Sequence, residues 1–384
     1  MLTGLRRAGK SILLHHKVLE LVESGVSWTQ IIYINFEDER LAEFSIKHFN
    51  DIVITAAELS DKEPYYFFDE IQNIDGWERF ARRLADSHAN VRITGSDAKM
   101  LSSEMESRLG ARYLSKNIMP YSFREYLNAL NIPFDDLSRS SAKGTGAINR
   151  ALLACMKEGG FPESLQYLSK QAYAESIYQK ILLGDIAARN GIRNAGSLRI
   201  LMKKIAETIM HEVSYNRLSG AVTGAGTKLS VGSVIQYTGY AKDACLIFTT
   251  SNYFAEFMEQ ESTPRYYFTD NALLNLFLVN KDSALFENMI ASALHRKYGD
   301  NVWYMKSSKA DVDFYVPETH QAVQTTLELD DSSRERELKS LIVLSSSFKE
   351  AKEFIIVTRN QTETIQLKNC TVKVMKAADF LLDL

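Results

Sequence analysis

One short segment near the start of the chain constrains the fold more than any other feature. Its residues, GLRRAGKS from Gly4 to Ser11, separate two glycines by four positions and follow the second glycine with Lys-Ser. In a P-loop this spacing lets backbone N–H groups curl around a polyphosphate, and a helix starts near the lysine. The segment therefore predicts an α/β fold with a parallel sheet of the P-loop NTPase type, wrapped by helices.

The P-loop is also the predicted binding site for ATP and Mg²⁺. Lys10 is expected to reach the β- and γ-phosphates, and the Ser11 hydroxyl is expected to ligate the metal ion. A chance match on a basic loop is the alternative, which the helical pattern after Lys10 disfavours. The predicted nucleotide-binding residues are Gly4, Arg7, Ala8, Gly9, Lys10, Ser11 and Ile12.

Two strand ends supply candidate residues for hydrolysis. The run YYFFDE ends in Asp69 and Glu70. Asp69 would hold Mg²⁺ through water, and Glu70 would polarise the attacking water. The run RITGS ends at Ser96, whose hydroxyl could sense the γ-phosphate. A solvated turn is the alternative for the first run, and a simple strand-to-turn transition for the second.

The bulk composition excludes several classes of protein. A formal net charge of −3 gives no global attraction for nucleic acid or for an anionic membrane, so any nucleic-acid surface must be a local patch. The cysteines lie far apart and form no CxxC pair, which argues against a zinc site and a disulfide framework. No apolar run approaches the roughly 20 residues that span a bilayer. We expect a cytoplasmic protein with no membrane partner.

The length of 384 residues exceeds the size at which one hydrophobic core usually stops growing. We expect a P-loop ATPase domain over residues 1–138, a helical region with a winged helix over 139–280, and a smaller nuclease-like α/β domain over 281–384. The polar segment from Asp135 to Gly146 is rich in Ser and Gly and is predicted to be the linker at the first boundary. Strands of the first domain are predicted at Ile31–Phe36, Ile52–Ile54, Tyr65–Phe68 and Val91–Thr94.

Longer runs extend these motifs into a resemblance to a known family. YINFEDERL (Tyr33–Leu41), DEIQNIDGWERF (Asp69–Phe80), ITGSDAKML (Ile93–Leu101) and MPYSFREYL (Met119–Leu127) resemble the prokaryotic AAA-type ATPases that carry a C-terminal domain of unknown function. GGFPE, YYFTDN, DVDFYV and VQTT carry the resemblance through the rest of the chain.

The resemblance implies roles for residues outside the P-loop. Asn35 would restrain the catalytic Glu70, and Arg112 or Arg108 would complete the site of a neighbouring subunit. The GGFP turn that starts at Gly159 would touch the nucleotide from a lid. Surface positions for the arginines and a simple helix break at the turn are the alternatives.

The segment before the P-loop departs from the pattern of such folds. A buried central strand normally precedes the loop, whereas only Met1, Leu2 and Thr3 precede Gly4. We expect either a chain that starts late or a severely shortened first strand. Both alternatives predict a less rigid phosphate loop and reduced turnover.

A winged helix is predicted between Ser214 and Thr269. Ser214 and Ser230 each stand ahead of a helical pattern, as N-caps do, and two β-prone runs follow. The second helix offers few groups for reading DNA bases or neutralising phosphates. These are Ser233, Gln236, Tyr237, Lys228 and Lys242. A role in contacting a protein, or as a lid, is the alternative.

The last domain resembles the PD-(D/E)xK nuclease fold. Glu287 would be its acidic helix residue, and Asp311 and Asp313 its strand carboxylates. Gln324-Thr325-Thr326 stands where the second carboxylate and the lysine should be. Nuclease chemistry needs both groups, so we expect an inactive nuclease fold kept for binding. An exposed strand edge is the alternative for the two aspartates.

Two hypotheses of function follow. The first is a slow Mg²⁺-dependent ATPase that acts as a molecular switch for a C-terminal module binding DNA or a protein, with a homo-oligomer as one form of partner. The second is a module that binds nucleotide for stability and does not hydrolyse it. Phosphate release distinguishes them.

Overall fold

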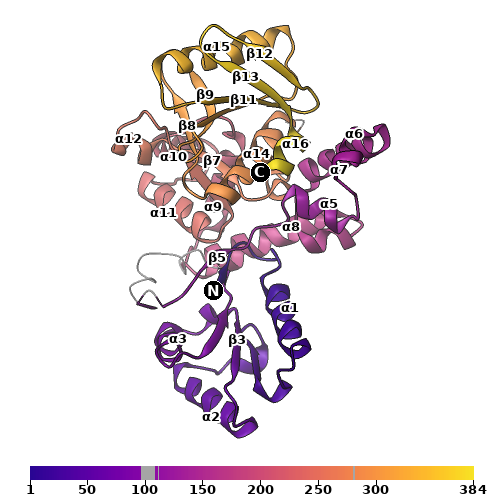
Figure 1. Ribbon diagram of the computed structural model, residues 1–384. Coiled ribbons are helices and arrows are strands. Elements are labelled where there is room, and N and C mark those ends of the chain that lie inside the picture. The colour runs from indigo at the N-terminus through magenta and orange to yellow at the C-terminus, as the bar shows by residue number, and fades with distance from the viewer. Residues whose placement is uncertain (97–108, 111, 280–281) are drawn as a thin grey trace. The chain divides into compact units, whose positions relative to one another are not determined.

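The computed structural model describes residues 1–96, 109–110, 112–279 and 282–384. Within these residues the chain forms two compact units (Figure 1). The first comprises Met1–Pro120 with Lys242–Cys245, and the second comprises Tyr121–Ala241 with Leu246–Leu384. The finer division at residues 138 and 280 stays a prediction.

Parallel strands form the sheet of the first unit. β2 (Ile31–Asn35), β3 (Tyr65–Asp69) and β4 (Asn90–Ile93) pair side by side, and β1 (Leu2–Thr3) pairs with β5 (Lys116–Asn117). A bridge from Leu2 to Thr94 joins the two sets in the order β2-β3-β4-β1-β5. Because the strands are parallel, the loops after β1, β3 and β4 meet at one edge of the sheet. The predicted parallel sheet of the P-loop type is confirmed.

Helices cover this sheet through apolar residues spaced at the helical period. Leu14 and Val18 of α1 pack on Phe67, and Phe49 of α2 stacks on Phe80 of α3 with ring centroids 4.4 Å apart. The helices are α1 (Lys10–Glu23), α2 (Phe49–Leu59) and α3 (Trp77–Asp86), with 3₁₀ turns η1 (Trp28–Gln30), η2 (Glu39–Leu41), η3 (Ile46–His48) and η4 (Ile71–Asn73).

The strand predicted at Ile52–Ile54 is wrong, because these residues lie inside α2. Ile52 and Ala56 are buried four positions apart on one helix face, while Ile54 is exposed. A short β-branched run could not reveal this longer period.

The second unit begins with helices. They are α5 (Phe123–Ala129), α6 (Asp136–Ser140), α7 (Ala142–Glu158), the 3₁₀ turn η6 (Pro162–Gln166), α8 (Lys170–Lys180), a π-helical continuation η7 (Ile181–Ala188) and α9 (Ala195–Glu207). The predicted helical region is confirmed, but the predicted linker from Asp135 to Gly146 is wrong. The Asp135 side chain accepts a hydrogen bond from Ser138 N at 2.8 Å, and Ser141 Oγ accepts one from Gly144 N at 3.1 Å. Those polar residues therefore cap α6 and α7.

Two helices and a hairpin follow in the predicted order. They are α10 (Tyr215–Gly224), α11 (Val231–Asp243), β6 (Ile247–Thr250), α12 (Phe257–Ser262), β7 (Arg265–Phe268) and α13 (Asn271–Asn275), with β6 and β7 antiparallel. Ser214 Oγ accepts from Arg217 N, and Ser230 Oγ accepts from Ser233 N, so both predicted N-caps are confirmed.

A mixed sheet completes the second unit, in the order β12-β13-β11-β10-β9-β8. Leu341 and Leu344 of α15 pack into its apolar core, and α14 and α16 lie on the other side of the sheet from α15 (Figure 1). The elements of this part are α14 (Asp282–Tyr298), β8 (Trp303–Lys306), β9 (Asp311–Val316), β10 (Gln321–Thr325), α15 (Asp331–Ser347), β11 (Glu353–Thr358), β12 (Glu363–Gln366), β13 (Thr371–Lys376) and α16 (Ala377–Asp383).

No helix among the described residues is long and apolar enough to cross a bilayer.

Candidate functional site

The loop from Gly4 to Lys10 contains three residues with positive φ. Gly4 and Gly9 adopt φ values of 128° and 105°, and Arg7 lies between them at 64°. A Cβ atom on Gly4 would stand 2.1 Å from the carbonyl oxygen of Ile118, whereas one on Gly9 would meet nothing within 4 Å. Gly4 thus allows close packing, and Gly9 leaves an open face where a ligand can approach the backbone.

The start of α1 adds a positive electrostatic field to this loop. Gly9 is the N-cap and has no side-chain cap, and the first N–H groups of any helix lack an intrahelical acceptor. Lys10 is buried, Ser11 is half-buried and Ile12 is 56% exposed. The backbone N–H groups of these residues lie in the first turn of α1. The helix start and the loop fit an anionic phosphate group.

Lys10 links the loop to the predicted catalytic strand. Its Nζ donates to the carbonyl oxygens of Gly4 and Leu5 at 3.0 and 3.1 Å, and it lies 3.9 Å from Glu70 Oε1. Burial lowers the pKa of Lys10, and the Glu70 carboxylate opposes that shift. The ammonium group is thus held mainly by neutral carbonyls beside one carboxylate.

Asp69 is fixed at the end of β3 by hydroxyl groups on both neighbouring strands. Tyr33 OH donates to Asp69 Oδ2 at 2.9 Å, and Thr94 Oγ1 donates to Asp69 Oδ1. Burial, followed by the charge of Asp69, raises the pKa of Tyr33 well above its ordinary range, so Tyr33 remains a donor. Sequence reasoning missed both residues, although each lies within a run that carries the family resemblance.

Glu70 has an unusual backbone as well as a suitable carboxylate. Its φ of 51° lies in the left-handed region, which non-glycine residues adopt rarely. Its N–H donates to Thr94 Oγ1 at 2.9 Å, and its Oε2 accepts from Gln72 Nε2 at 2.5 Å. The carboxylate is thereby held between Lys10 and Gln72.

The remaining predicted catalytic residues are Ser96, Arg112 and Arg108. Ser96 is buried and accepts from Gln72 Nε2 at 3.4 Å. Arg112 forms an ion pair with Asp86 and donates to Gly110 O at 3.0 Å. Arg108 lies outside the described residues. The roles of Ser96 and Arg112 stay predictions.

Two residue sets that the resemblance singles out have local partners in the structure. Asn35 Oδ1 accepts from Glu37 N at 2.9 Å. In the second unit, Gly160 N donates to Asp270 Oδ2 at 2.8 Å, and a Cβ atom on Gly159 would lie 1.9 Å from Asp270 Oδ1. The GGFP turn therefore needs glycine for this contact, and its proposed contact with nucleotide stays a prediction.

The site geometry agrees with comparisons to known proteins. Residues 1–127 match the family described as an AAA domain, and residues 149–284 match a domain of unknown function, DUF8612. An uncharacterized protein of Methanocaldococcus jannaschii is 30% identical over 346 residues, which cover 88% of this chain and 76% of that protein. The chain belongs to the AAA-type P-loop ATPase family. It is a nucleotide-binding protein of the ATPase type.

Two further proteins are similar to this AAA-type chain. An uncharacterized protein of Haemophilus influenzae is 26% identical over 394 residues, covering 100% of this chain and 94% of its own. The Walker-type ATPase of Pyrococcus abyssi is similar in structure over 72% of this chain and 90% of its own, with 15% identity and a TM-score of 0.44.

The predicted nuclease-like residues of this AAA-type protein meet around a buried arginine. Arg265 on β7 is 1% exposed, and its Nη2 lies 2.5 Å from Asp311 Oδ1. Its Nη1 lies 3.7 Å from Asp313 Oδ1, and its guanidinium carbon lies 4.4 Å from the ring centre of Tyr304. Sequence reasoning missed Arg265, because nothing in the run RYYF points to a partner in β9. An arginine supplies the positive charge between these carboxylates.

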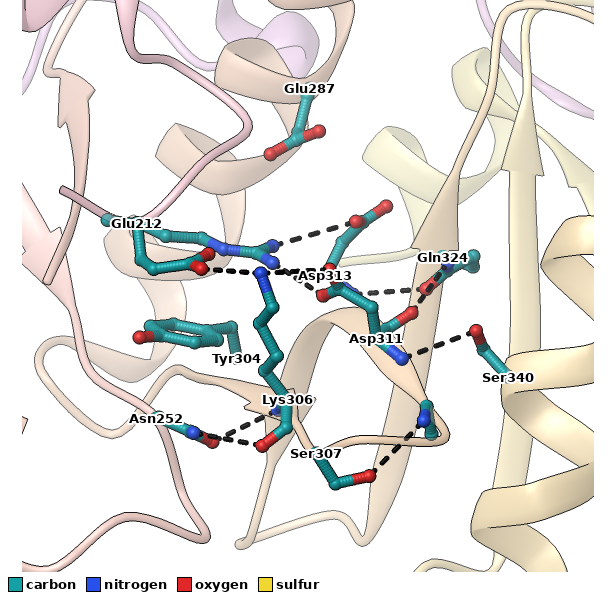
Figure 2. Close-up of polar contacts among 12 residues, drawn as sticks. Glu212, Asn252, Glu287, Tyr304, Lys306, Ser307, Asp311, Asp313, Gln324 and Ser340 are labelled. Carbon is teal, nitrogen blue, oxygen red and sulfur yellow. Dashed lines mark hydrogen bonds and ion pairs between the residues drawn. The ribbon is translucent and has the colours of Figure 1, made fainter. Parts of the chain in front are cut away.

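The surrounding polar groups are also used within the protein. Figure 2 shows the side chain of Lys306 reaching Glu212, and its Nζ lies 3.8 Å from Asp311 Oδ2. Glu287 accepts from Tyr267 OH at 2.9 Å. Among the described residues, no group of three or more His, Cys, Asp or Glu side chains is arranged to hold a metal ion.

The residues in place of the second nuclease carboxylate and the lysine also have internal partners. Gln324 Nε2 donates to Glu337 Oε2 at 2.6 Å. Its Oε1 accepts from Asp313 N at 3.0 Å, and Figure 2 shows this contact. Thr325 donates to Asp313 Oδ2 through both its N and its Oγ1, at 2.7 and 2.9 Å. The absence of nuclease chemistry at this cluster stays a prediction.

Proposed function

We propose that this AAA-type protein hydrolyses Mg²⁺-bound ATP slowly and that its nucleotide state acts as a switch for the second unit. One observation carries the proposal: Lys10 Nζ lies 3.9 Å from the Glu70 carboxylate. This contact joins the phosphate loop to the strand end that bears the predicted base. Binding and hydrolysis can then act on the same phosphate group.

The residues of this edge suit the proposed ligands. Backbone N–H groups from Gly9 to Ile12 and the Lys10 ammonium would hold the phosphates. The Ser11 hydroxyl and the Asp69 carboxylate are oxygen donors of the kind Mg²⁺ prefers. When bound, Mg²⁺ neutralises charge on the transferring phosphoryl group. Tyr33 and Thr94 would hold the Asp69 carboxylate in one orientation toward it.

Glu70 is the proposed general base. Its carboxylate would accept a proton from the water that attacks the γ-phosphate. Arg112 of a second copy is the proposed source of the additional positive charge, which makes hydrolysis by one chain slow. Hydrolysis is favoured over the non-hydrolysing alternative because the Glu70 carboxylate is held between Lys10 and Gln72 beside the phosphate loop.

The switch would act on a binding module that belongs to the second unit except for Lys242–Cys245. We assign this role to the segment from α10 to β7, whose helix, turn, helix and hairpin follow the order of a winged helix. Gln236 and Lys242 are exposed on α11. DNA or a protein is the proposed partner, and a salt-dependent shift of labelled duplex DNA would identify the first.

Phosphate release under saturating Mg²⁺–ATP tests the proposal. Glu70→Gln should bind ATP as the parent does and release phosphate at least about 100-fold more slowly, because the base is lost. Glu58→Gln, on the exposed face of α2, is the matched control and should behave as the parent. If the parent releases no phosphate above background, hydrolysis is refuted and the nucleotide-stabilised binding module remains.

A further inference from the structure

We propose that Gln72 is a positioning residue that couples Ser96 to the general base Glu70, an inference that rests on the proposed ATPase reaction. The side chain of Gln72 reaches both groups with a single amide nitrogen. Its Nε2 lies 2.5 Å from Glu70 Oε2 and 3.4 Å from Ser96 Oγ. One donor thus connects the strand end that bears the base to the loop after β4.

The local backbone explains how Gln72 comes to lie there. Gln72 occupies the 3₁₀ turn η4, which follows directly after the left-handed Glu70. Ile71 N donates to Thr94 O at 3.3 Å, and Asn73 N donates to Glu70 O at 3.2 Å. The turn is therefore anchored to β4 and folds the Gln72 side chain back over the strand ends.

The orientation of the amide is set by Glu70. Gln72 Oε1 is fully enclosed and has no hydrogen-bond partner among the described residues. Leaving a buried acceptor unpaired costs free energy. Rotating the amide would bring Oε1 against the Glu70 carboxylate, where two acceptors repel each other. The donor must face Glu70, so the Glu70 contact decides how the whole side chain lies.

The contact has a defined effect on the base. A hydrogen bond donated to a carboxylate oxygen fixes the direction in which the carboxylate points. Glu70 Oε1 faces Lys10 at 3.9 Å while Oε2 faces Gln72, so each oxygen has a different neighbour. Gln72 thus keeps the Glu70 carboxylate aligned, and a displacement of Ser96 by the γ-phosphate would reach Glu70 through the same amide.

Asn35, the residue that the family resemblance offers for this task, is engaged elsewhere. Its side chain is exposed and accepts from Glu37 N within its own turn. Gln72, in contrast, donates a hydrogen bond to the Glu70 carboxylate. Asparagine at position 72 would be one methylene too short to reach both partners, and glutamate would place two carboxylates together.

Steady-state kinetics of Gln72→Ala, Gln72→Asn and Gln72→Glu test the inference. Gln72→Ala should lower kcat about tenfold and leave the calorimetric Kd for ATP within about twofold, because the base loses its donor and the phosphate loop does not change. The loss should therefore appear in kcat and leave the KM for ATP unchanged. Gln72→Glu should lower kcat further, because it places a second carboxylate beside Glu70, and Gln72→Asn should not restore kcat.

A matched control separates positioning from folding. Gln30 is a buried glutamine in another 3₁₀ turn of the first unit, where its Nε2 donates to Glu63 O at 3.0 Å. Gln30→Ala should alter thermal stability and leave both kcat and the KM for ATP unchanged. The double variant Gln72→Ala/Ser96→Ala should be no slower than the slower single variant, because both substitutions break one relay.

The outcomes distinguish this inference from the proposed function. If the parent releases no phosphate above the Lys10→Ala background, the proposed function fails and the relay fails with it. If the parent hydrolyses ATP but Gln72→Ala keeps the parental kcat, the relay alone is overturned. A loss of kcat that appears equally in Gln30→Ala, or one that Gln72→Asn restores, also overturns it.

Discussion

Lys10 and Arg265 are both buried cations beside carboxylates, but their surroundings differ in kind. Lys10 donates to the backbone carbonyls of Gly4 and Leu5, and the Glu70 carboxylate is 3.9 Å away. Arg265 lies 2.5 Å from Asp311 and also has Asp313 and the Tyr304 ring as neighbours. A cation held by neutral carbonyls retains its attraction for a polyanion, whereas one matched by carboxylates does not.

The pKa shifts of the two cations have opposite directions, in agreement with this comparison. Burial lowers the pKa of Lys10. Burial also acts to lower the pKa of Arg265, but Tyr267, Asp311 and Asp313 more than compensate and raise it above its ordinary value. The P-loop region around Lys10 can thus attract an anionic ligand, whereas the positive charge of Arg265 is neutralised by carboxylates of the protein itself. Substitutions in the first should change ATP chemistry, and substitutions in the second should change stability.

Replacing Arg265 should have the largest effect on stability. Arg265→Met leaves Asp311 and Asp313 without their buried partner, and such a loss costs about 3–5 kcal/mol. Urea unfolding, with hydrogen exchange of β9 peptides as the reporter of the second unit, measures the cost. The surface pair Arg334–Glu363 supplies the control, since Arg334→Met should cost less than about 1 kcal/mol. A tenfold change in ATP affinity in Arg265→Met would contradict the claim that this region affects stability alone.

Replacing Thr94 should affect both stability and metal use. Thr94→Val keeps the shape of the side chain but removes the hydroxyl that donates to Asp69 and accepts from Glu70 N. An unpaired buried N–H costs about 1–3 kcal/mol, and a looser Asp69 should raise the Mg²⁺ concentration needed for half-maximal phosphate release. Thermal unfolding and a Mg²⁺ titration test this; a parental Mg²⁺ requirement would show that Thr94 only supports the fold.

Protonation of the carboxylate cluster should make the stability of the second unit depend on pH. Burial, and then the charge of Asp313, raises the pKa of Glu287 to about 8. Because the folded state binds this proton more tightly than the unfolded state, stability should fall as pH rises from about 4.5 toward 8, at about 1 kcal/mol per pH unit or less. Glu287→Gln should flatten the slope in urea midpoints. A stability that rises over this window would contradict the account.

Replacing Asp311 should have the smallest effect. Its side chain is 49% exposed, so water screens its contact with Arg265. Asp311→Asn should cost less than about 1 kcal/mol. Asp313→Asn, at a side chain only 16% exposed, should cost more in the same unfolding measurement. Equal costs for the two substitutions would show that burial does not determine how much each aspartate contributes to stability.

Local patterns explain which features could be predicted from the sequence. The P-loop and the Asp69-Glu70 strand end depend on neighbours in the chain, so their elements and their meeting at one sheet edge follow from pattern alone. Asp135 and Ser141 were misinterpreted because N-caps and linkers share the same residue types. Arg265 could not be found because its partner Asp311 lies 46 positions away in another sheet. Gln72 is two residues from Glu70, but its contact depends on the left-handed turn between them.

Calorimetric titration of Mg²⁺–ATP into the parent and Lys10→Ala tests the central claim most directly. The account predicts that the parent binds and that Lys10→Ala loses at least about 100-fold in affinity, because the ammonium faces the phosphates. Lys17→Ala, an exposed lysine on the same helix, should bind as the parent does. Equal affinity of the parent and Lys10→Ala would contradict the claim that this loop receives a polyphosphate.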